Sequence, residues 1–444
     1  MLSYKEQKSR LFAFPAVLSI LLIFLLEVFR PIKFPFADDW LLIPWINHSA
    51  NPLSSDIFAL VNGHQQAFTK IFFWLIGLRT PINLEIVSFT NFISFILGIF
   101  FLLKYIKFRM GKSYTKEGLF LLSAIALNLK PLQNYFMPIC AGWMHAFLFI
   151  GVFFWSITPN GARYKSTFRT LCILLAPFTI GLGLVIPLLV IVEFFLNFLK
   201  KNIFPIKINY IDFVVAILSI ITSYLIPTLM LSSRNISSTK AIQGPGLFLW
   251  NSLKSILILV GSVFAPSNRF SPLPEEIIGL CLFIFFAWCI RTSNSMEKIL
   301  REPLVLTGFI FLCLIVLMRN GDQQASLLNL SSPRYVTGTL LLIIGVTLHL
   351  LTNFNLKSLQ GKLIICLILI MEIGSIKTGI NWNTTRFLQS RSIHECINLG
   401  NSVDLKAGNK CFNEAKTQSM PMTDENFSLQ LGKFIQSSDF ARKL

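Results

Sequence analysis

Residues 11–29 read LFAFPAVLSILLIFLLEVF, a run in which Glu27 is the single charged residue. Crossing the hydrocarbon core of a membrane as an α-helix takes about 20 apolar residues, and this run is of that length. No small-residue cleavage site follows it, so we expect a first transmembrane helix and not a cleaved signal peptide.

The same pattern recurs along the 444-residue chain, of which 54% is hydrophobic and 14% charged. Soluble domains carry about a quarter charged residues, so the composition excludes an ordinary soluble enzyme. We predict an all-α polytopic membrane protein with about 10–12 transmembrane helices, some of them short or interrupted by Pro and Gly. The further apolar stretches are 83–103, 118–136, 138–157, 168–182, 184–199, 210–231, 247–264, 276–292, 303–318, 335–352 and 363–380.

Basic residues set the expected orientation. Lys and Arg number 39 against 21 Asp and Glu, a net charge of +18, which in so apolar a chain indicates orientation and lipid-headgroup contact and not nucleic-acid binding. We expect the loops that carry the basic clusters to be cytoplasmic. The first large loop, 30–82, then faces outward, as do the turn at 128–138 and the loop 232–246. The basic clusters fall within 5–10, 104–116, 163–169 and 200–207.

In the second half of the chain, the basic residues conflict with a simple alternation of membrane crossings. Arg291, Lys298 and Arg301 favour the cytoplasmic side, yet two complete crossings at 247–264 and 276–292 would place them outside. We therefore predict that one of these two segments does not cross. Residues 1–380 form one membrane unit in this scheme.

The remaining residues, 381–444, are predicted to form a polar tail outside the membrane. Cys396 and Cys411 of this tail either pair in an oxidising compartment or remain free thiols.

The first outer loop holds the most informative polar residues, FPFADDW at 34–40 and NGHQQ at 62–66. The adjacent carboxylates Asp38 and Asp39 point in different directions on either a helix or a strand, so one can act as a base while the other orients it or holds a metal. Alternatively, one of them caps the amphipathic segment Trp40 to Ile46, with Trp40 and Trp45 at headgroup depth. His64 is either catalytic or an interfacial histidine.

A second polar cluster lies at the expected outer turn. Gln133 and Asn134 are close in sequence to Lys130, and Trp143 and His145 follow shortly after. These residues either bind a ligand or solvate the turn while Lys130 extends to the interface.

A third cluster comes late in the chain. Arg319 precedes a second outer turn, and Arg334 with Tyr335 opens the following helix. A guanidinium beside a phenol suits a phosphate group, although both residues also serve as interfacial anchors.

Together, these landmarks resemble bacterial multi-pass glycosyltransferases of the GT-C type. They are, in order, Ala-Asp-Asp-Trp after the first helix, Asn-x-His about 25 residues later, Gln-x-Asn near Gly-Trp, Gly-Leu-x-x-x-Pro, and Arg-Tyr at the start of a late helix, over residues 11–352. The resemblance implies a GT-C-like bundle of about eleven helices with the active site in the first outer loop. It also implies a polyprenyl-phosphate-linked sugar donor and an inverting transfer that needs an acidic residue of that loop.

The chain departs from the family at Gly63 and Gln65, where members often carry Glu and Arg. The phosphate-side role of that Arg would pass to Lys70, Arg79 or Arg334.

The polar residues of the first outer loop allow a direct displacement of the donor phosphate at the anomeric carbon of the sugar. We expect Asp38 to take the proton of the acceptor hydroxyl and Asp39 to orient Asp38, although the sequence does not show which of the two carboxylates is the base. His64, Lys70 and Arg334 would stabilise the leaving phosphate. No cofactor is expected, and a divalent metal is possible but not favoured, because Asp56 is the one further acidic residue near the pair. Expected substrate-binding residues are Trp40, His64, Lys70, Gln133, Asn134, Arg319, Arg334 and Tyr335.

The sequence therefore predicts a glycosyltransferase of cell-envelope polysaccharide biosynthesis in a bacterial plasma membrane, with its active site outside. Its acceptor would be a lipid-linked or cell-surface glycan, and its partners the donor lipid and the surrounding membrane. A lipid or solute transporter or flippase, a surface-polysaccharide polymerase and a non-catalytic assembly protein remain alternatives. Charged residues in the middle of membrane spans would favour the transporter.

Overall fold

The structure of the chain is a computed structural model. It describes residues 4–30, 42–46, 48, 50–59, 64–77, 84–111, 115–159, 164–199, 208–231, 245–264, 273–292, 298–299, 301–319, 330, 333–353 and 359–402.

The described residues form helices and no extended strand, which confirms the prediction of an all-α protein. The α-helices are α1 (Tyr4–Phe29), α2 (Ile43–Ile46), α3 (Ala67–Gly77), α4 (Leu84–Met110), α5 (Lys116–Ala126), α6 (Gln133–Phe136), α7 (Ala141–Ser156), α8 (Tyr164–Leu175), α9 (Val185–Phe198), α10 (Tyr210–Leu231), α11 (Pro245–Gly261), α12 (Leu273–Thr292), α14 (Pro303–Arg319), α16 (Pro333–Asn353) and α17 (Leu359–Ser402). The short 3-10 helices are η2 (Ser55–Phe58), η4 (Lys130–Leu132), η5 (Pro138–Cys140), η6 (Ala176–Phe178) and η7 (Gly181–Leu184).

Several helices suit a membrane. Within the described ranges, 3 helices are long and apolar enough to cross one, or 4 if a bent pair counts as a single span. Six shorter apolar helices accompany them. These features support a multi-pass membrane protein, and the predicted number of about 10–12 crossings stays a prediction.

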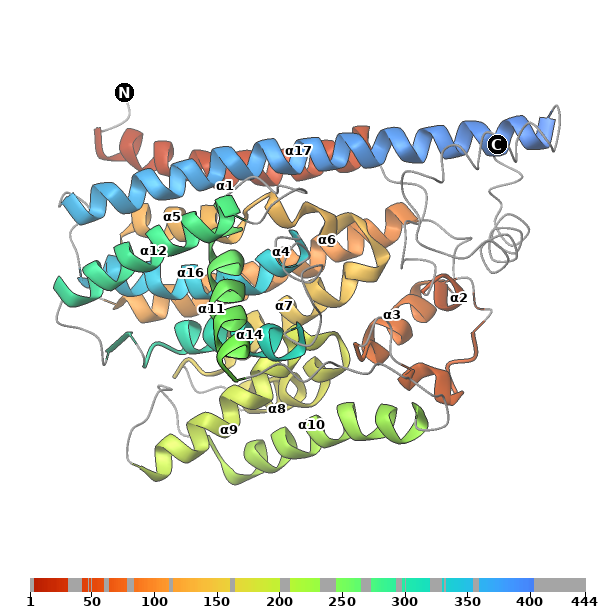
Figure 1. The fold of residues 1–444 in the computed structure, drawn as a ribbon, viewed down its shortest axis with the longest axis horizontal. Helices are drawn as coiled ribbons and strands as arrows, with labels where there is room; N and C mark the ends of the chain where they lie inside the picture. Colours follow the sequence, from red (N-terminus) through yellow and green to blue (C-terminus); the bar gives the residue numbers. More distant parts are fainter. Residues whose placement is uncertain are drawn as a thin grey trace.

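The long helices run in a common direction. In Figure 1, α1, α4, α16 and α17 follow the long axis of the molecule, and α1 lies beside α17 along its upper edge. The guanidinium of Arg30, which follows α1, donates to the Thr384 hydroxyl at 2.6 Å and fixes the two helices in register. α11 stands across this direction in the same view, and the number of segments that cross the membrane stays a prediction.

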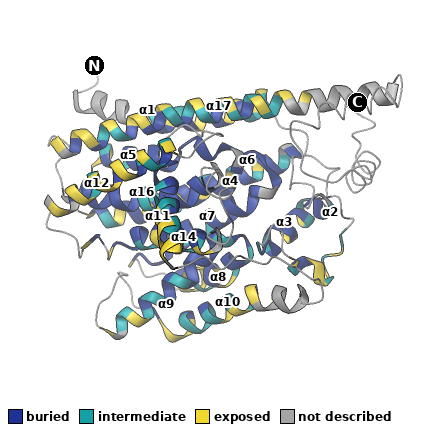
Figure 2. Ribbon diagram, in the orientation of Figure 1, coloured by how far each residue is buried: buried dark blue, intermediate teal, exposed yellow. Residues whose placement is uncertain are grey.

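Burial separates an inner from an outer set of helices. Figure 2 shows α4, α6, α7 and α16 mostly buried, whereas α1, α10, α12 and α17 present exposed faces. These faces are apolar, as Phe24 (50% exposed), Phe283 (61%) and Ile373 (70%) illustrate. Exposed apolar surface on this scale requires lipid and not water as its solvent.

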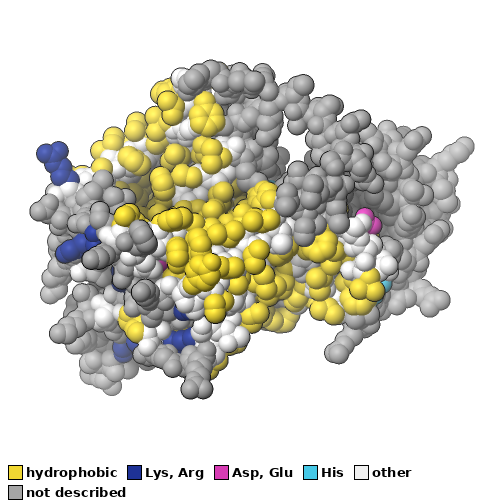
Figure 3. Space-filling view, turned by 90° about the horizontal axis from the view of Figure 1, so that it is seen from below, with side chains coloured by type: hydrophobic (Ala, Val, Ile, Leu, Met, Phe, Trp, Pro, Cys, Tyr) yellow, Lys and Arg dark blue, Asp and Glu magenta, His cyan; other side chains and the backbone are white. Residues whose placement is uncertain are grey.

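Charged side chains gather at one end of the molecule, which we call the basic end. Arg109 at the end of α4 pairs with Glu302 before α14 at 2.6 Å, and Arg169 near the start of α8 pairs with Asp212 near the start of α10 at 2.6 Å. Figure 3 shows Lys and Arg at one side of a broad apolar surface. The expected cytoplasmic clusters 104–116 and 163–169 therefore lie at a common end.

Lys298 and Glu302 share this end, because Lys298 and Arg109 both act electrostatically on His349 near the end of α16 and Glu302 pairs with Arg109. Lys298 thus lies at the same end of the molecule as Arg109, and the cytoplasmic side predicted for both stays a prediction.

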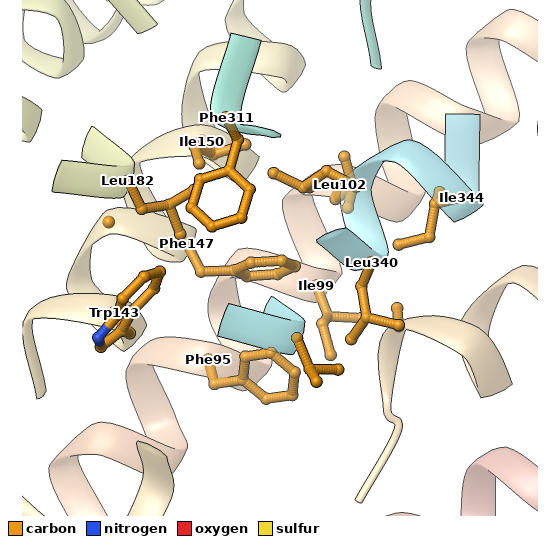
Figure 4. Close-up of a cluster of buried hydrophobic side chains, with 14 of the residues drawn as sticks. Phe95, Ile99, Leu102, Trp143, Phe147, Ile150, Leu182, Phe311, Leu340 and Ile344 are labelled. Atoms are coloured by element: carbon orange, nitrogen blue, oxygen red, sulfur yellow. The ribbon is translucent and has the colours of Figure 1, made fainter. Parts of the chain in front are cut away.

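The core lies where α4, α7, α14 and α16 meet. Figure 4 shows Phe147 of α7 among Phe95, Phe311 and Leu182, and the rings of Phe95 and Phe147 are 5.0 Å apart between centroids. All four side chains are at most 1% exposed. Aromatic packing of this kind adds about 0.5–1.5 kcal/mol per pair beyond the area it buries.

Glycines allow the closest helix contacts. The most extensive contacts are α4 with α7, α11 with α12, and α14 with α16, and each pair meets at a glycine. A Cβ atom on Gly151 of α7 would overlap the carbonyl oxygen of Gly98 in α4, and one on Gly261 of α11 would overlap the carbonyl oxygen of Glu275 in α12. Small residues at membrane helix interfaces let backbones approach in this way.

The described side chains of the segment 128–138 are buried, and the helical segments Lys130–Phe136 and Ala141–Ser156 are bent by 104° against each other. The outward orientation predicted for this turn stays a prediction. The boundary at residue 380 falls inside α17, which continues to Ser402 because Asn383 and Thr384 still pack against Arg30. Cys411 and the Cys396 side chain lie outside the described residues.

We predict that Gly151→Ala lowers the stability of the fold. The added methyl group forces α4 and α7 apart, at a cost of about 1–3 kcal/mol for an overpacked core. Thermal unfolding of the purified chain in detergent measures the effect. Gly246→Ala is the matched control, because a Cβ atom at Gly246 would have no other atom within 4 Å. Equal midpoints for the two variants would contradict the prediction.

Candidate functional site

The predicted site residues divide into three groups. Asp38, Asp39 and Trp40 lie outside the described residues, so their roles stay predictions. Gln133, Arg319 and Arg334 lie in α6, at the end of α14 and at the start of α16, but their side chains are not among those described. The structure places the side chains of His64, Lys70, Asn134 and Tyr335.

Lys70 holds the first outer loop together. Its ammonium group on α3 donates to the carbonyl oxygens of Asp56 at 2.7 Å, Ile57 at 3.2 Å and Ala59 at 2.7 Å. It also lies 5.2 Å from the ring centroid of Trp45 in α2. All three donors of the ammonium are thus directed at η2 and its end. This geometry favours a structural role for Lys70 over the predicted contact with a phosphate.

The environment of Lys70 also changes its acidity. The side chain is 2% exposed. Burial lowers the pKa of Lys70 to about 8, and the nearby Asp56 carboxylate partly opposes this shift. An ammonium this deeply buried is retained because carbonyl oxygens replace the water that it loses.

The start of α3 is fixed by Gln65. Its side-chain oxygen accepts a hydrogen bond from the Ala67 backbone N–H at 3.0 Å, and its amide donates to the carbonyl of Phe58 at 3.2 Å. Gln65 therefore caps the helix and joins it to η2. His64, directly before it, is partly exposed.

The two faces of α3 are reversed relative to a helix in water. Thr69 and Lys70 are 0% and 2% exposed, whereas Ile71 and Leu75 are 41% and 54% exposed. A helix with its polar face inward and apolar face outward fits an environment of lipid. The polar face of α3 is therefore directed at the rest of the protein.

That polar face contacts α7. The Thr69 hydroxyl lies 3.3 Å from Nδ1 of His145, and the His145 ring packs edge-on against Phe72 with centroids 4.6 Å apart. His145 is 1% exposed, and no hydrogen-bond partner for its Nε2 atom is found among the described residues. Thr69 was not among the predicted site residues, because its burial against α7 is visible only in the structure.

α7 and α6 in turn contact α16. The rings of Trp143 and Tyr335 meet edge to face with centroids 5.7 Å apart. The Asn134 side-chain amide donates to the Thr337 hydroxyl at 2.8 Å. The first outer loop, the Gln-x-Asn and Gly-Trp elements, and the Arg-Tyr helix start therefore form one continuous set of contacts.

Lys130 does not extend to the membrane interface, as one of the two alternatives had it. It is 2% exposed, and its ammonium donates to the carbonyl of Ser262 at the end of α11, with Glu275 of α12 acting on it electrostatically. The solvated-turn interpretation is wrong, because the bend between η4 and α7 turns this segment into the molecule. Trp45 is likewise buried, at 4% exposed, and packs on Lys70.

The described part of the site contains hydrogen-bonding groups and aromatic rings. Within the described ranges, no group of three His, Cys, Asp or Glu side chains is placed to hold a metal ion. Since Asp38 and Asp39 lie outside those ranges, independence from metal stays a prediction.

We predict that Lys70→Met releases η2 from α3. Loss of the ammonium leaves three carbonyl oxygens without their donor, so protease cleavage within residues 55–59 should increase and stability should fall by about 1–3 kcal/mol. Limited proteolysis of the chain in detergent, with cleavage sites read by mass spectrometry, tests this. Lys104→Met, on an exposed side chain, is the control. Unchanged cleavage in Lys70→Met would refute the structural role.

The same lysine predicts a pH dependence. The unfolded chain keeps the Lys70 proton up to about pH 10.5, whereas the folded chain releases it at about pH 8. Between these values the unfolded state binds more protons, so the folding stability of wild type relative to Lys70→Met should rise with pH. Unfolding midpoints of both proteins at pH values across this window measure the difference. A gap that stays constant or shrinks would contradict the lowered pKa.

Comparison of the chain with protein-family models, with curated proteins and with solved structures finds no match.

Proposed function

We propose that the chain is an integral-membrane glycosyltransferase that moves a sugar from a polyprenyl-phosphate donor to a lipid-linked or cell-surface glycan. The proposed reaction takes place at the first outer loop, on the extracytoplasmic face of a bacterial plasma membrane. The proposal extends the resemblance to GT-C enzymes and rests on one structural observation.

That observation is the contact path from the first outer loop to α16. Thr69 of α3 meets His145 of α7 at 3.3 Å, and Trp143 of α7 meets Tyr335 of α16 at a centroid distance of 5.7 Å. Residues of the first loop and of a late helix, far apart in the sequence, are thus joined by contacts through α7. An active site assembled from a first loop and a late helix needs this proximity.

The proposed reaction is a single displacement at the anomeric carbon. The acceptor hydroxyl forms the new C–O bond while its proton passes to Asp38, and the bond to the phosphate oxygen breaks with its electron pair. Asp39 orients Asp38. The departing phosphate gains negative charge, which Arg334 and His64 would stabilise. Since Lys70 is engaged with three carbonyls, Arg334 is the stronger candidate for the phosphate.

The surface suits a lipid substrate. Exposed apolar side chains form a broad surface beside the basic end (Figure 3), and Ile71 and Leu75 present exposed apolar side chains on α3. A polyprenyl chain in the bilayer would reach the first loop along such a surface, with its phosphate at the depth of the polar residues. A single phosphate also needs less help from a metal ion than a diphosphate does.

Buried charge favours one alternative, a transporter or flippase. Lys130 and Glu275 are 2% and 0% exposed, and the segment that starts at Lys130 is a broken helix with a bend of 104°. Broken helices with internal ionisable residues are typical of secondary transporters. The two functions differ in a measurable way, because a transferase forms a glycosidic bond and a transporter does not.

We predict that Asp38→Asn or Asp39→Asn abolishes sugar transfer. Loss of a general base should lower the rate by about a hundredfold or more. Membranes containing each variant at matched protein levels are incubated with labelled polyprenyl-phosphate sugars, and the glycosylated product is measured. Asp56→Asn serves as the matched control, because Asp56 is an exposed carboxylate of the same loop.

The results separate the proposals. Loss in one Asn variant with retention in Asp56→Asn supports the loop as the catalytic element. Transfer unchanged in both variants contradicts it. Movement of the labelled lipid across the membrane without product formation would favour the transporter.

A further inference from the structure

A second acidic residue lies far from the first outer loop in the sequence. Glu372 is in α17, within the apolar stretch Gly361–Leu388 that is long enough to cross a membrane, and it is 3% exposed. Ser375, one turn later on the same helix, is 1% exposed, whereas Ile373 between them is 70% exposed. The carboxylate therefore belongs to the inward face of α17.

The surroundings of Glu372 offer little compensation for a negative charge. Neither carboxylate oxygen has a hydrogen bond within 3.5 Å to the part of the chain that the structure describes. Two polar side chains act on the group, the Ser19 hydroxyl of α1 and the Tyr135 phenol of α6. Both are at most 1% exposed and neither carries a positive charge.

Three lysines of the neighbouring helices are bound to another group or exposed. Lys130 of η4 donates to Ser262. On α17 itself Lys377 is exposed, and on α5 Lys116 is exposed at the first residue of the helix. Among the side chains that the structure describes on these elements, the remaining titratable groups are Glu27 of α1, Glu117 of α5, Tyr335 and His349 of α16, and Lys362, Arg386 and Arg391 of α17.

A carboxylate cannot stay charged at such a place without a counter-charge. Burying an unpaired ion costs many kcal/mol, so a small cation must accompany the group. A metal cation takes about six or more oxygen ligands, far more than Ser19 and Tyr135 provide. A proton needs one carboxylate oxygen and no further ligand.

The position of Glu372 connects it to the broken helix. Gly379, two turns further along the same face of α17, packs on the carbonyl oxygen of Leu129, and Trp382 stacks on Phe136 with ring centroids 6.4 Å apart. Tyr135 lies in the same segment and donates towards the carbonyl of Asn128 at 3.5 Å. A charge that forms at Glu372 would therefore act on the contact between α17 and residues 128–136.

We propose that Glu372 is a reversible proton-binding site inside the helical bundle, where α17 packs on α1 and on the broken helix. Binding transfers a proton from water to one carboxylate oxygen, and release returns it to water with no other bond changed. Loss of the proton leaves an uncompensated charge and weakens the contact of α17 with residues 128–136. The site is independent of the proposed transfer reaction and of Asp38 and Asp39.

The test is infrared titration of the purified full chain in lipid nanodiscs. The carboxylic C=O stretch is recorded as pH is varied, for wild type, Glu372→Gln and Glu276→Gln. Glu276 is the matched control, because it is a partly exposed glutamate in the first turn of α12. We expect one carboxyl band that titrates apart from the surface carboxyls, is absent in Glu372→Gln and persists in Glu276→Gln.

A second variant keeps the result interpretable if Glu372→Gln does not fold. Glu372→Asp retains the carboxyl group, so it should retain a separate band with a changed titration midpoint. A band that is identical in wild type and Glu372→Gln would overturn the proposal, as would a band that responds to sodium at constant pH but not to pH. Loss of sugar transfer in the Asp38 or Asp39 variants has no bearing on this band, so the two proposals fail separately.

Discussion

The contact of α4 with α7 at Gly98 and Gly151 is the constraint on which the rest of the structure depends. Lipid gives helices no hydrophobic reason to associate, so membrane helices are held by close packing of their backbones and by polar contacts. Without side chains at these two positions, α7 can lie directly on α4. This places Phe147 in the core, and it places Trp143 and His145, earlier on α7, where they meet α16 and α3.

The contacts of the buried charged side chains have the same cause, the absence of water around them. Lys70 and Lys130 direct their ammonium groups at backbone carbonyls, whereas Arg169 and Arg109 pair with Asp212 and Glu302. In each case the protein supplies the ligands that water would otherwise provide. α3 illustrates the result most clearly, because its polar face is buried and its apolar face is exposed.

The two proposals concern different parts of the molecule. The proposed sugar transfer takes place at the first outer loop, which is joined to α16 through Thr69, His145, Trp143 and Tyr335. Glu372 lies in the membrane-length part of α17, against α1 and the broken helix. An enzyme that handles a charged lipid and a transporter both need polar groups within a helical bundle, so bond formation at the first loop is what distinguishes them.

The sequence by itself determined the class of protein, because long hydrophobic runs leave helices as the structure that satisfies the backbone in lipid. It also singled out Asn134 and Tyr335, whose side chains stand out in apolar sequence. Only the tertiary structure decided which polar groups are buried and what they contact. The hydropathy of the sequence does not predict the 104° bend after Lys130 or the continuation of α17 past residue 380. Nor does it predict the three carbonyl oxygens that accept hydrogen bonds from Lys70. The group that replaces water around a buried charge comes from another part of the chain. Local sequence patterns therefore determine the helices, whereas the environment of each charge depends on how the helices pack.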